Sequence, residues 1–86
     1  MPQDQAGHYF SEVDNIRVTY IPAANRAAGK DWSGSDVIRI QSYKNPARHR
    51  ALQQGAEFPV PSPDALIRFI ETLCTAYHGG RSPRNL

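Results

Sequence analysis

The C-terminal third of the chain constrains the fold most, because it carries a complete amphipathic helix signature. Ser62 is a suitable N-cap, Pro63 suits the first helical position, and Asp64 places an anion at the positive end of the helix dipole. Apolar residues then recur every three or four positions, at Leu66, Ile67, Ile70, Leu73, Cys74 and Tyr77. The glycine pair at 79–80 is typical of a helix end. The pattern predicts one helix over residues 63–78, whose apolar stripe needs a surface to cover.

Two segments with alternating apolar and polar residues predict the strands that provide this surface. Residues 15–21 read NIRVTYI and residues 36–43 read DVIRIQSY, so apolar side chains recur at every second position. A third strand is expected near residues 55–60, and the proline within it favours a sheet edge. Residues 51–54 either extend this strand backwards through a bulge at Gly55 or form a short strand of their own.

Together these elements predict an α+β fold: a small antiparallel β-sheet of three to four strands followed by one C-terminal amphipathic helix packed on one face. Residues 1–12 lack hydrophobic periodicity, and the tail at 79–86 is rich in glycine and polar residues. We therefore expect a flexible arm and a flexible tail around a single domain at 13–78. A chain of 86 residues builds only a small core, so its size favours a homodimer.

Cysteine and histidine usage narrows the function classes. Cys74 is the only cysteine, and His8, His49 and His78 are far apart in sequence, so neither a disulfide nor a zinc pattern is present. No metal or cofactor is expected, and a cytoplasmic location fits the lone thiol. The sequence shows no signal peptide and no membrane span. Catalysis is not expected, because no motif supplies a nucleophile with a base and an orienting group.

The cations of the chain concentrate in its middle. Residues 15–55 contain seven Lys and Arg residues against two Asp residues. If the apolar residues of the first two strands lie under the helix, alternation places their polar neighbours on an opposite, open face. Cations follow phosphates and an aromatic ring stacks on any base, which suits single-stranded nucleic acid. The predicted nucleic-acid-binding residues of this face and its loops are Arg17, Thr19, Arg26, Lys30, Trp32, Arg39, Gln41, Tyr43, Lys44, Arg48 and Arg50.

The sequence therefore predicts a non-catalytic domain that prefers single-stranded DNA or RNA, with transcription or replication as the expected setting. Each residue also has an ordinary structural interpretation: Arg17 and Arg39 as solubilising residues, and Trp32 as a packed plug or dimer contact. Arg, Tyr and Trp are also the anchors of protein interfaces. The alternative function is thus a protein-protein interaction module, or a small subunit of a larger assembly, that uses the same open sheet face.

The order of these elements resembles a known family. The segments IRVTY, DVIRIQSY and QQGAEFPVPSPDALIRFIETL are similar to the single-stranded-DNA-binding domain of the transcriptional coactivator positive cofactor four and its bacterial relatives, over about residues 15–77. The resemblance implies a dimer formed partly through the helices and a curved sheet that binds single strands. The chain departs from that family in two places. Gln53 and Gln54 stand where lysines usually precede the glycine, and the connection between the first two strands is longer.

Overall fold

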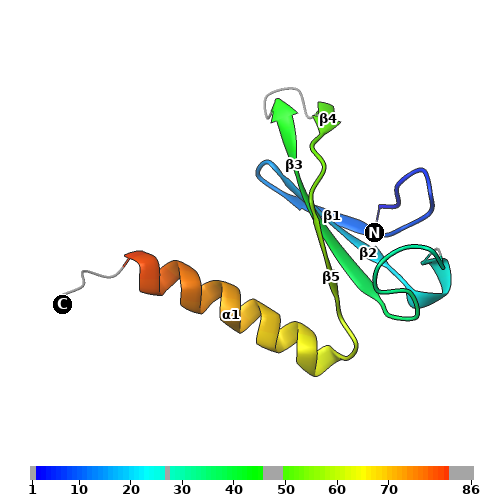
Figure 1. Cartoon of the computed structure of the whole chain (residues 1–86). Helices are drawn as coiled ribbons and strands as arrows, with labels where there is room; N and C mark the ends of the chain where they lie inside the picture. The colour runs from blue at the N-terminus through cyan, green and yellow to red at the C-terminus, as the bar shows by residue number, and fades with distance from the viewer. Residues whose placement is uncertain (1, 27, 46–49, 82–86) are drawn as a thin grey trace.

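The computed structural model describes residues 2–26, 28–45 and 50–81. Five strands form one antiparallel sheet, and a long helix leaves it at the C-terminal side (Figure 1). The elements are β1 (Phe10–Val13), β2 (Ile16–Ile21), a short 3-10 helix (Ala23–Asn25), β3 (Val37–Asn45), β4 (Arg50–Leu52), β5 (Ala56–Pro59) and α1 (Pro63–Arg81). The predicted fold class, an antiparallel sheet followed by one C-terminal helix, is confirmed.

Strand β3 is the centre of the sheet, with β2 along one edge and both β4 and β5 along the other. The backbone N–H of Gln53 donates to the carbonyl of Ser42 at 2.8 Å, so the link between β4 and β5 stays on the same edge. At Gly55 a Cβ atom would overlap the backbone carbonyl of Ile40. Both alternatives expected for residues 51–54 are thus partly correct. These residues contribute to a short strand of their own, β4, and the chain then runs along the same edge of β3 into β5 through an irregular segment that needs a glycine at position 55.

The N-terminal residues are more ordered than the sequence indicated. Residues 10–12, expected in a flexible arm, form β1 together with Val13 and pair with β2. The two strands are joined by a turn in which Asp14 has φ 54°. The Asp4 carboxylate accepts hydrogen bonds from the backbone N–H groups of Ala6 and His8, both at 2.9 Å. Because only Phe10 and Val13 are apolar in β1, its hydrophobic pattern is too short to predict a strand.

The C-terminal helix begins as predicted but ends later. The Ser62 hydroxyl accepts a hydrogen bond from the N–H of Ala65 at 3.1 Å, which is the expected N-cap. The helix continues through Gly79 and Gly80 to Arg81, beyond the predicted end at residue 78. Glycine lowers helix stability by about 1 kcal/mol per residue without forbidding helical dihedrals, so a glycine pair does not fix the end. The rest of the predicted tail, residues 82–86, lies outside the described residues.

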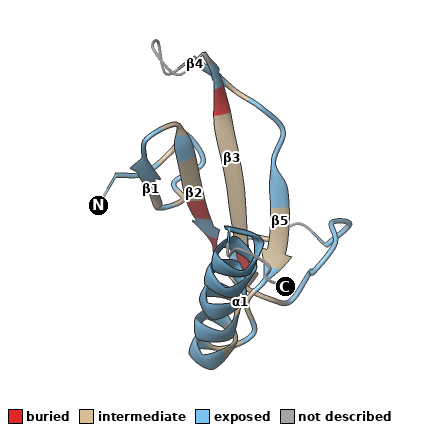
Figure 2. Cartoon of the chain, turned by 90° about the vertical axis from the view of Figure 1, so that its left-hand side faces the viewer, coloured by how far each residue is buried: buried red, intermediate tan, exposed pale blue. Residues whose placement is uncertain are grey.

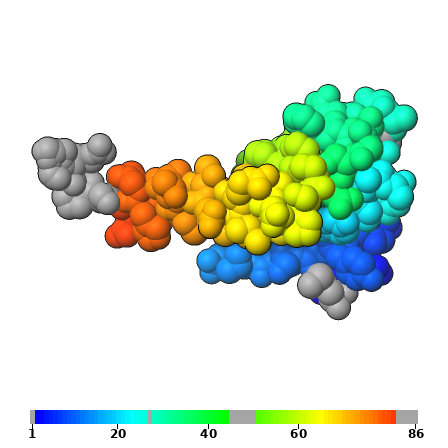
Figure 3. All heavy atoms as spheres, turned by 90° about the horizontal axis from the view of Figure 1, so that it is seen from below, coloured from blue at the N-terminus to red at the C-terminus, as the bar shows by residue number. Residues whose placement is uncertain are grey.

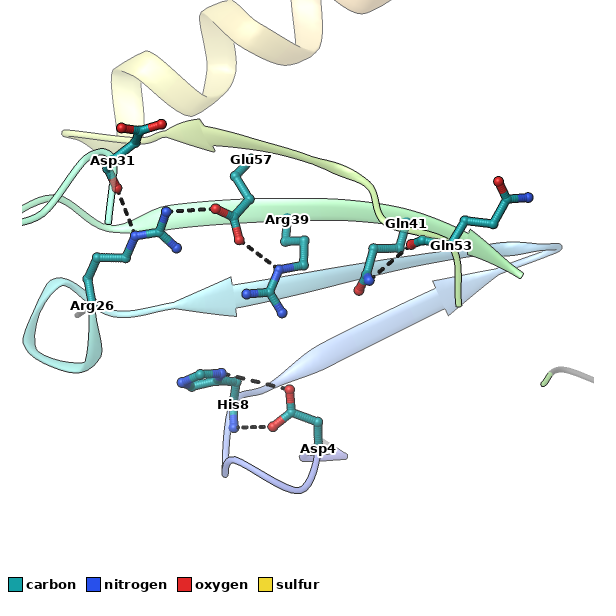
Figure 4. A network of polar contacts seen from close by, with 8 residues as sticks. All are labelled: Asp4, His8, Arg26, Asp31, Arg39, Gln41, Gln53 and Glu57. Carbon is teal, nitrogen blue, oxygen red and sulfur yellow. Dashed lines mark hydrogen bonds and ion pairs between the residues drawn. The ribbon is translucent and has the colours of Figure 1, made fainter. Parts of the chain in front are cut away.

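The two faces of the sheet are covered in the opposite way to the expectation. We call the face with Arg17, Thr19, Ile21, Val37, Arg39, Gln41, Tyr43 and Glu57 the charged face, since strand pairing places these side chains together. Thr19, Ile21, Val37 and Tyr43 are the buried residues of the described chain, at 6% exposure or less. The N-terminal segment and the β2–β3 loop lie on this side (Figures 1 and 4). The face expected to be open therefore holds the core.

The opposite face carries Ile16, Val18, Tyr20, Ile38, Ile40 and Phe58, and we call it the apolar face. It was expected to lie under the helix, yet Ile16 and Tyr20 are 39% and 38% exposed. Helix α1 meets the sheet through the ring of Phe69, whose centroid is 5.0 Å from that of Phe58, and then extends away from it (Figures 1 and 2). None of residues 63–81 is buried. In the single chain the predicted helix packing is limited to this first part of α1.

Candidate nucleic-acid interface

A groove lies between the β2–β3 loop and the strands of the charged face. It has a volume of about 470 Å³ and is lined by Lys30, Asp31, Trp32, Arg39, Gln41, Gln54, Gly55 and Glu57. Loop residues 30–32 form one wall, while β3 and the segment leading into β5 form the other. Four predicted nucleic-acid-binding residues, two from the loop (Lys30, Trp32) and two from β3 (Arg39, Gln41), thus meet in one groove. We refer to it below as the charged groove.

Two arginines and one carboxylate hold the loop to the sheet. The Arg26 Nη2 donates to Glu57 Oε1 at 2.6 Å, and the Arg39 Nε donates to Glu57 Oε2 at 2.8 Å (Figure 4). Arg26 also donates through Nε to the carbonyl of Asp31 at 2.8 Å. The Arg26 side chain is only 4% exposed, so it is placed to anchor the loop. The Arg39 side chain is 32% exposed and keeps access to the charged groove.

Glu57 is strongly acidic because of these contacts. The hydrogen bond from Arg26, followed by that from Arg39, lowers the pKa of Glu57 to about 2, against the opposing effect of its partial burial. The carboxylate is therefore ionised at neutral pH. The cluster Arg26–Glu57–Arg39 then carries one net positive charge beside Lys30 and Asp31.

Trp32 occupies an unusual position at the groove wall. Its backbone has φ 64°, in the left-handed region that bulky residues rarely adopt. A turn holds it there, since the N–H of Ser35 donates to the carbonyl of Trp32 at 3.0 Å. The side chain is 47% exposed. A strained aromatic residue with an accessible ring is typical of a ligand-contact position.

Arg17, Thr19 and Tyr43 are on the charged face but not in the groove. Arg17 donates to Glu12 at 2.8 Å and to the Tyr43 hydroxyl at 3.0 Å, and its guanidinium lies 3.8 Å from the centre of the Phe10 ring. The Tyr43 hydroxyl donates to the Glu12 carboxylate, which raises the pKa of the phenol above its ordinary value. Thr19 and Tyr43 are buried. Arg17 and Tyr43 thus hold β1 against the sheet through Glu12 and Phe10, while Thr19 is part of the core.

The basic loop after β3 lies largely outside the described residues. Lys44 is exposed in β3, while Arg48 lies outside the described residues. For Arg50 the structure describes the backbone in β4, and its side chain lies outside the description. Sequence reasoning missed Glu57, the carboxylate that pairs with Arg39. Glu57 lies directly opposite Arg39 in the β3–β5 register, which would identify it as the partner of Arg39. The sequence alone does not give that register.

Comparisons with family models, with curated proteins and with solved structures found no match to this chain. The function is therefore inferred from the charged groove, and the resemblance to the positive cofactor four domain stays a prediction. Within the described ranges, no three His, Cys, Asp or Glu side chains come together as metal ligands, and no helix is long and apolar enough to cross a membrane.

Proposed function

We propose that this chain is a non-catalytic domain that binds single-stranded nucleic acid in the charged groove. The observation that carries the proposal is the exposed ring of Trp32 in the same groove as Lys30, Arg39 and Gln41. The ring offers a stacking surface for an unpaired base, the two cations suit phosphates, and the amide suits a base edge or a sugar. This function agrees with the single-strand binding that the resemblance to the positive cofactor four domain implies.

The charges of the groove favour modest, salt-sensitive binding. In the lining, Lys30 and Arg39 are balanced by Asp31 and Glu57. Arg26, which binds Glu57 from outside the lining, adds one surplus positive charge. With Lys30 and Arg39 each meeting one phosphate, single-strand affinity should fall with a log-log salt slope of about −1.4. Raising the salt concentration from 50 to 200 mM should then weaken binding about sevenfold. A far steeper slope would indicate that other cations of the chain carry the binding.

The test uses Trp32 itself, because it is the only tryptophan of the chain. Oligonucleotides of unmodified single-stranded DNA are titrated into the protein, and the intrinsic fluorescence is followed together with the anisotropy of labelled single-stranded and duplex probes. Stacking should quench the Trp32 emission at the concentrations where the anisotropy rises, and duplex DNA should bind more weakly. No binding at low salt, or equal binding to duplex, would refute the proposal.

Two matched variants test whether single-strand binding depends on the charged groove or only on the net charge of the chain. Arg39→Ala removes a cation from the groove, and Arg68→Ala removes an exposed cation from helix α1. Both substitutions lower the net charge of the chain by one unit. We expect Arg39→Ala to weaken single-strand binding and Arg68→Ala to leave it nearly unchanged. Equal losses in both variants would show that binding follows net charge and not the groove.

A further inference from the structure

Asp31 is a residue of the charged groove that the proposed function does not use. It lines the groove beside Trp32 and is exposed. Within the described part of the chain its carboxylate forms no hydrogen bond or ion pair, because Arg26 contacts the Asp31 carbonyl instead. In Figure 4 the carboxylate lies on the side of Asp31 away from Arg26. An unpaired anion beside cations that meet phosphates opposes binding, unless it faces the base and not the backbone of the strand.

We propose that Asp31 makes the charged groove prefer guanine among the unpaired bases. This inference rests on the proposed function, since it assigns the base that stacks on Trp32. The Watson–Crick edge of guanine is free in a single strand and carries two adjacent donors, N1–H and the N2 amino group, which match the two oxygens of one carboxylate. Thymine and uracil offer one N–H between two carbonyls, while adenine and cytosine offer an amino group beside a ring nitrogen acceptor. Guanine alone therefore gives a carboxylate two hydrogen bonds without placing an acceptor against it.

The β2–β3 loop holds the carboxylate and the ring in the same wall of the groove. Hydrogen bonds fix the backbone at both residues: Arg26 Nε donates to the Asp31 carbonyl at 2.8 Å, and the N–H of Ser35 donates to the Trp32 carbonyl at 3.0 Å. Arg26 is itself held by Glu57 at 2.6 Å. A base stacked on the ring directs its edge sideways, so the groups beside the ring meet that edge. Because the loop is already held in place, little ordering is needed when such a contact forms.

The other charged residues of the groove are suited to different tasks. Both carboxylate oxygens of Glu57 accept from arginines, so among the lining residues Asp31 is the carboxylate left for a base edge. Lys30 and Arg39 are the cations suited to phosphates. An arginine can also recognise guanine, through the O6 and N7 atoms on the opposite edge of the base. The Nε of Arg39 already donates to Glu57 at 2.8 Å, so the observations favour Asp31 for this role.

The test is competition anisotropy with unlabelled single strands of about five nucleotides, close to the smallest sites of single-strand-binding domains. Each strand is thymine throughout except for a central guanine, adenine, cytosine, inosine or thymine, and one guanine per strand avoids guanine quadruplexes. A bidentate base contact discriminates about 5- to 150-fold, so the guanine strand should bind at least about fivefold more tightly than the thymine strand. Inosine lacks the N2 amino group and keeps O6 and N7, so its affinity should lie between those of guanine and thymine.

A pair of variants assigns the preference to Asp31. Asp31→Asn replaces one acceptor by an amino group, so it should lower the guanine preference to about twofold or less. It should bind the thymine strand at least as tightly as the wild type, because the groove loses a negative charge. Glu71→Gln removes the same charge from helix α1, which projects away from the sheet (Figures 1 and 3), and should keep the full preference. Far-UV circular dichroism checks that both variants remain folded.

The outcomes separate this inference from the proposed function. Equal affinity for all strands would overturn the guanine preference and leave single-strand binding intact. Binding to none of the strands would overturn both. An inosine strand that binds as tightly as the guanine strand, or a preference that survives in Asp31→Asn, would show that another group recognises the base and would overturn the role of Asp31.

Discussion

Replacing Glu57 by Gln tests the arginine pair that holds the β2–β3 loop to the sheet. Glutamine keeps the size of the side chain and removes its charge, which leaves Arg26 and Arg39 without their shared carboxylate. The folded pKa of about 2 lies below the ordinary 4.5, so ionised Glu57 stabilises the fold above about pH 4.5 and loses this effect as the pH falls through 2. The whole shift corresponds to about 3.4 kcal/mol. Because the side chain is 27% exposed, solvent screening reduces the expected loss to about 1–2 kcal/mol at pH 7.

The assay is urea unfolding at a fixed protein concentration, followed by circular dichroism at several pH values between 7 and 2.5. Glu57→Gln should be less stable than the wild type at pH 7, and the difference should shrink as the pH falls below 4.5. Glu71→Gln, which alters an exposed carboxylate of helix α1, serves as the control and should change stability by less than about 0.5 kcal/mol. A stability difference between Glu57→Gln and wild type that does not depend on pH would refute the assigned role of the carboxylate.

The same variant also connects stability with binding. Removing the Glu57 charge raises the positive charge beside the charged groove by one unit and leaves Arg39 without a competing carboxylate. Single-strand affinity should therefore increase, while the salt slope should stay at about −1.4, because Lys30 and Arg39 remain the two phosphate contacts. If Glu57→Gln raises single-strand affinity and lowers stability, then Arg39 contacts the nucleic acid and is not only a structural residue. Unchanged affinity would place the binding surface elsewhere.

Other variants test single features of the structure. Trp32→Ala should weaken single-strand binding about 5- to 150-fold, as the loss of one stacked base predicts, while Trp32→Phe should retain most of the affinity in the anisotropy assay. Gly55→Ala should lower the free energy of unfolding by about 1–3 kcal/mol, because its Cβ would overlap the carbonyl of Ile40. Gly29→Ala is its control: a Cβ there meets open space, so urea unfolding should show a change below about 0.5 kcal/mol.

The sequence predicts the helix and the main strands of this fold, but it does not predict which face of the sheet is covered. Alternation in β2 and β3 and the cap at Ser62 are local signals, and the structure contains each of them. Which sheet face is covered depends on the path of the N-terminal segment and the β2–β3 loop, which carry no periodic pattern. The charged face was therefore expected to be open. In fact it contains Val37, with no exposed surface, and the pair Arg39 and Glu57, which cross-strand register brings together.

The exchange of the two faces places the charged groove and the exposed apolar surface on opposite sides of the sheet. A charged face can be covered by loops because paired arginines and carboxylates satisfy one another there, as Arg26, Arg39 and Glu57 do. Among the described residues, helix α1 contacts the apolar face through Phe58 and Phe69 and then extends away from the sheet (Figure 1), so much of this face stays half-exposed. The charged groove lies on the other face of the sheet. Ile70→Glu on the helix should therefore leave single-strand binding nearly unchanged, whereas Trp32→Ala should weaken it; a loss of binding in Ile70→Glu that equals the loss in Trp32→Ala would contradict this separation.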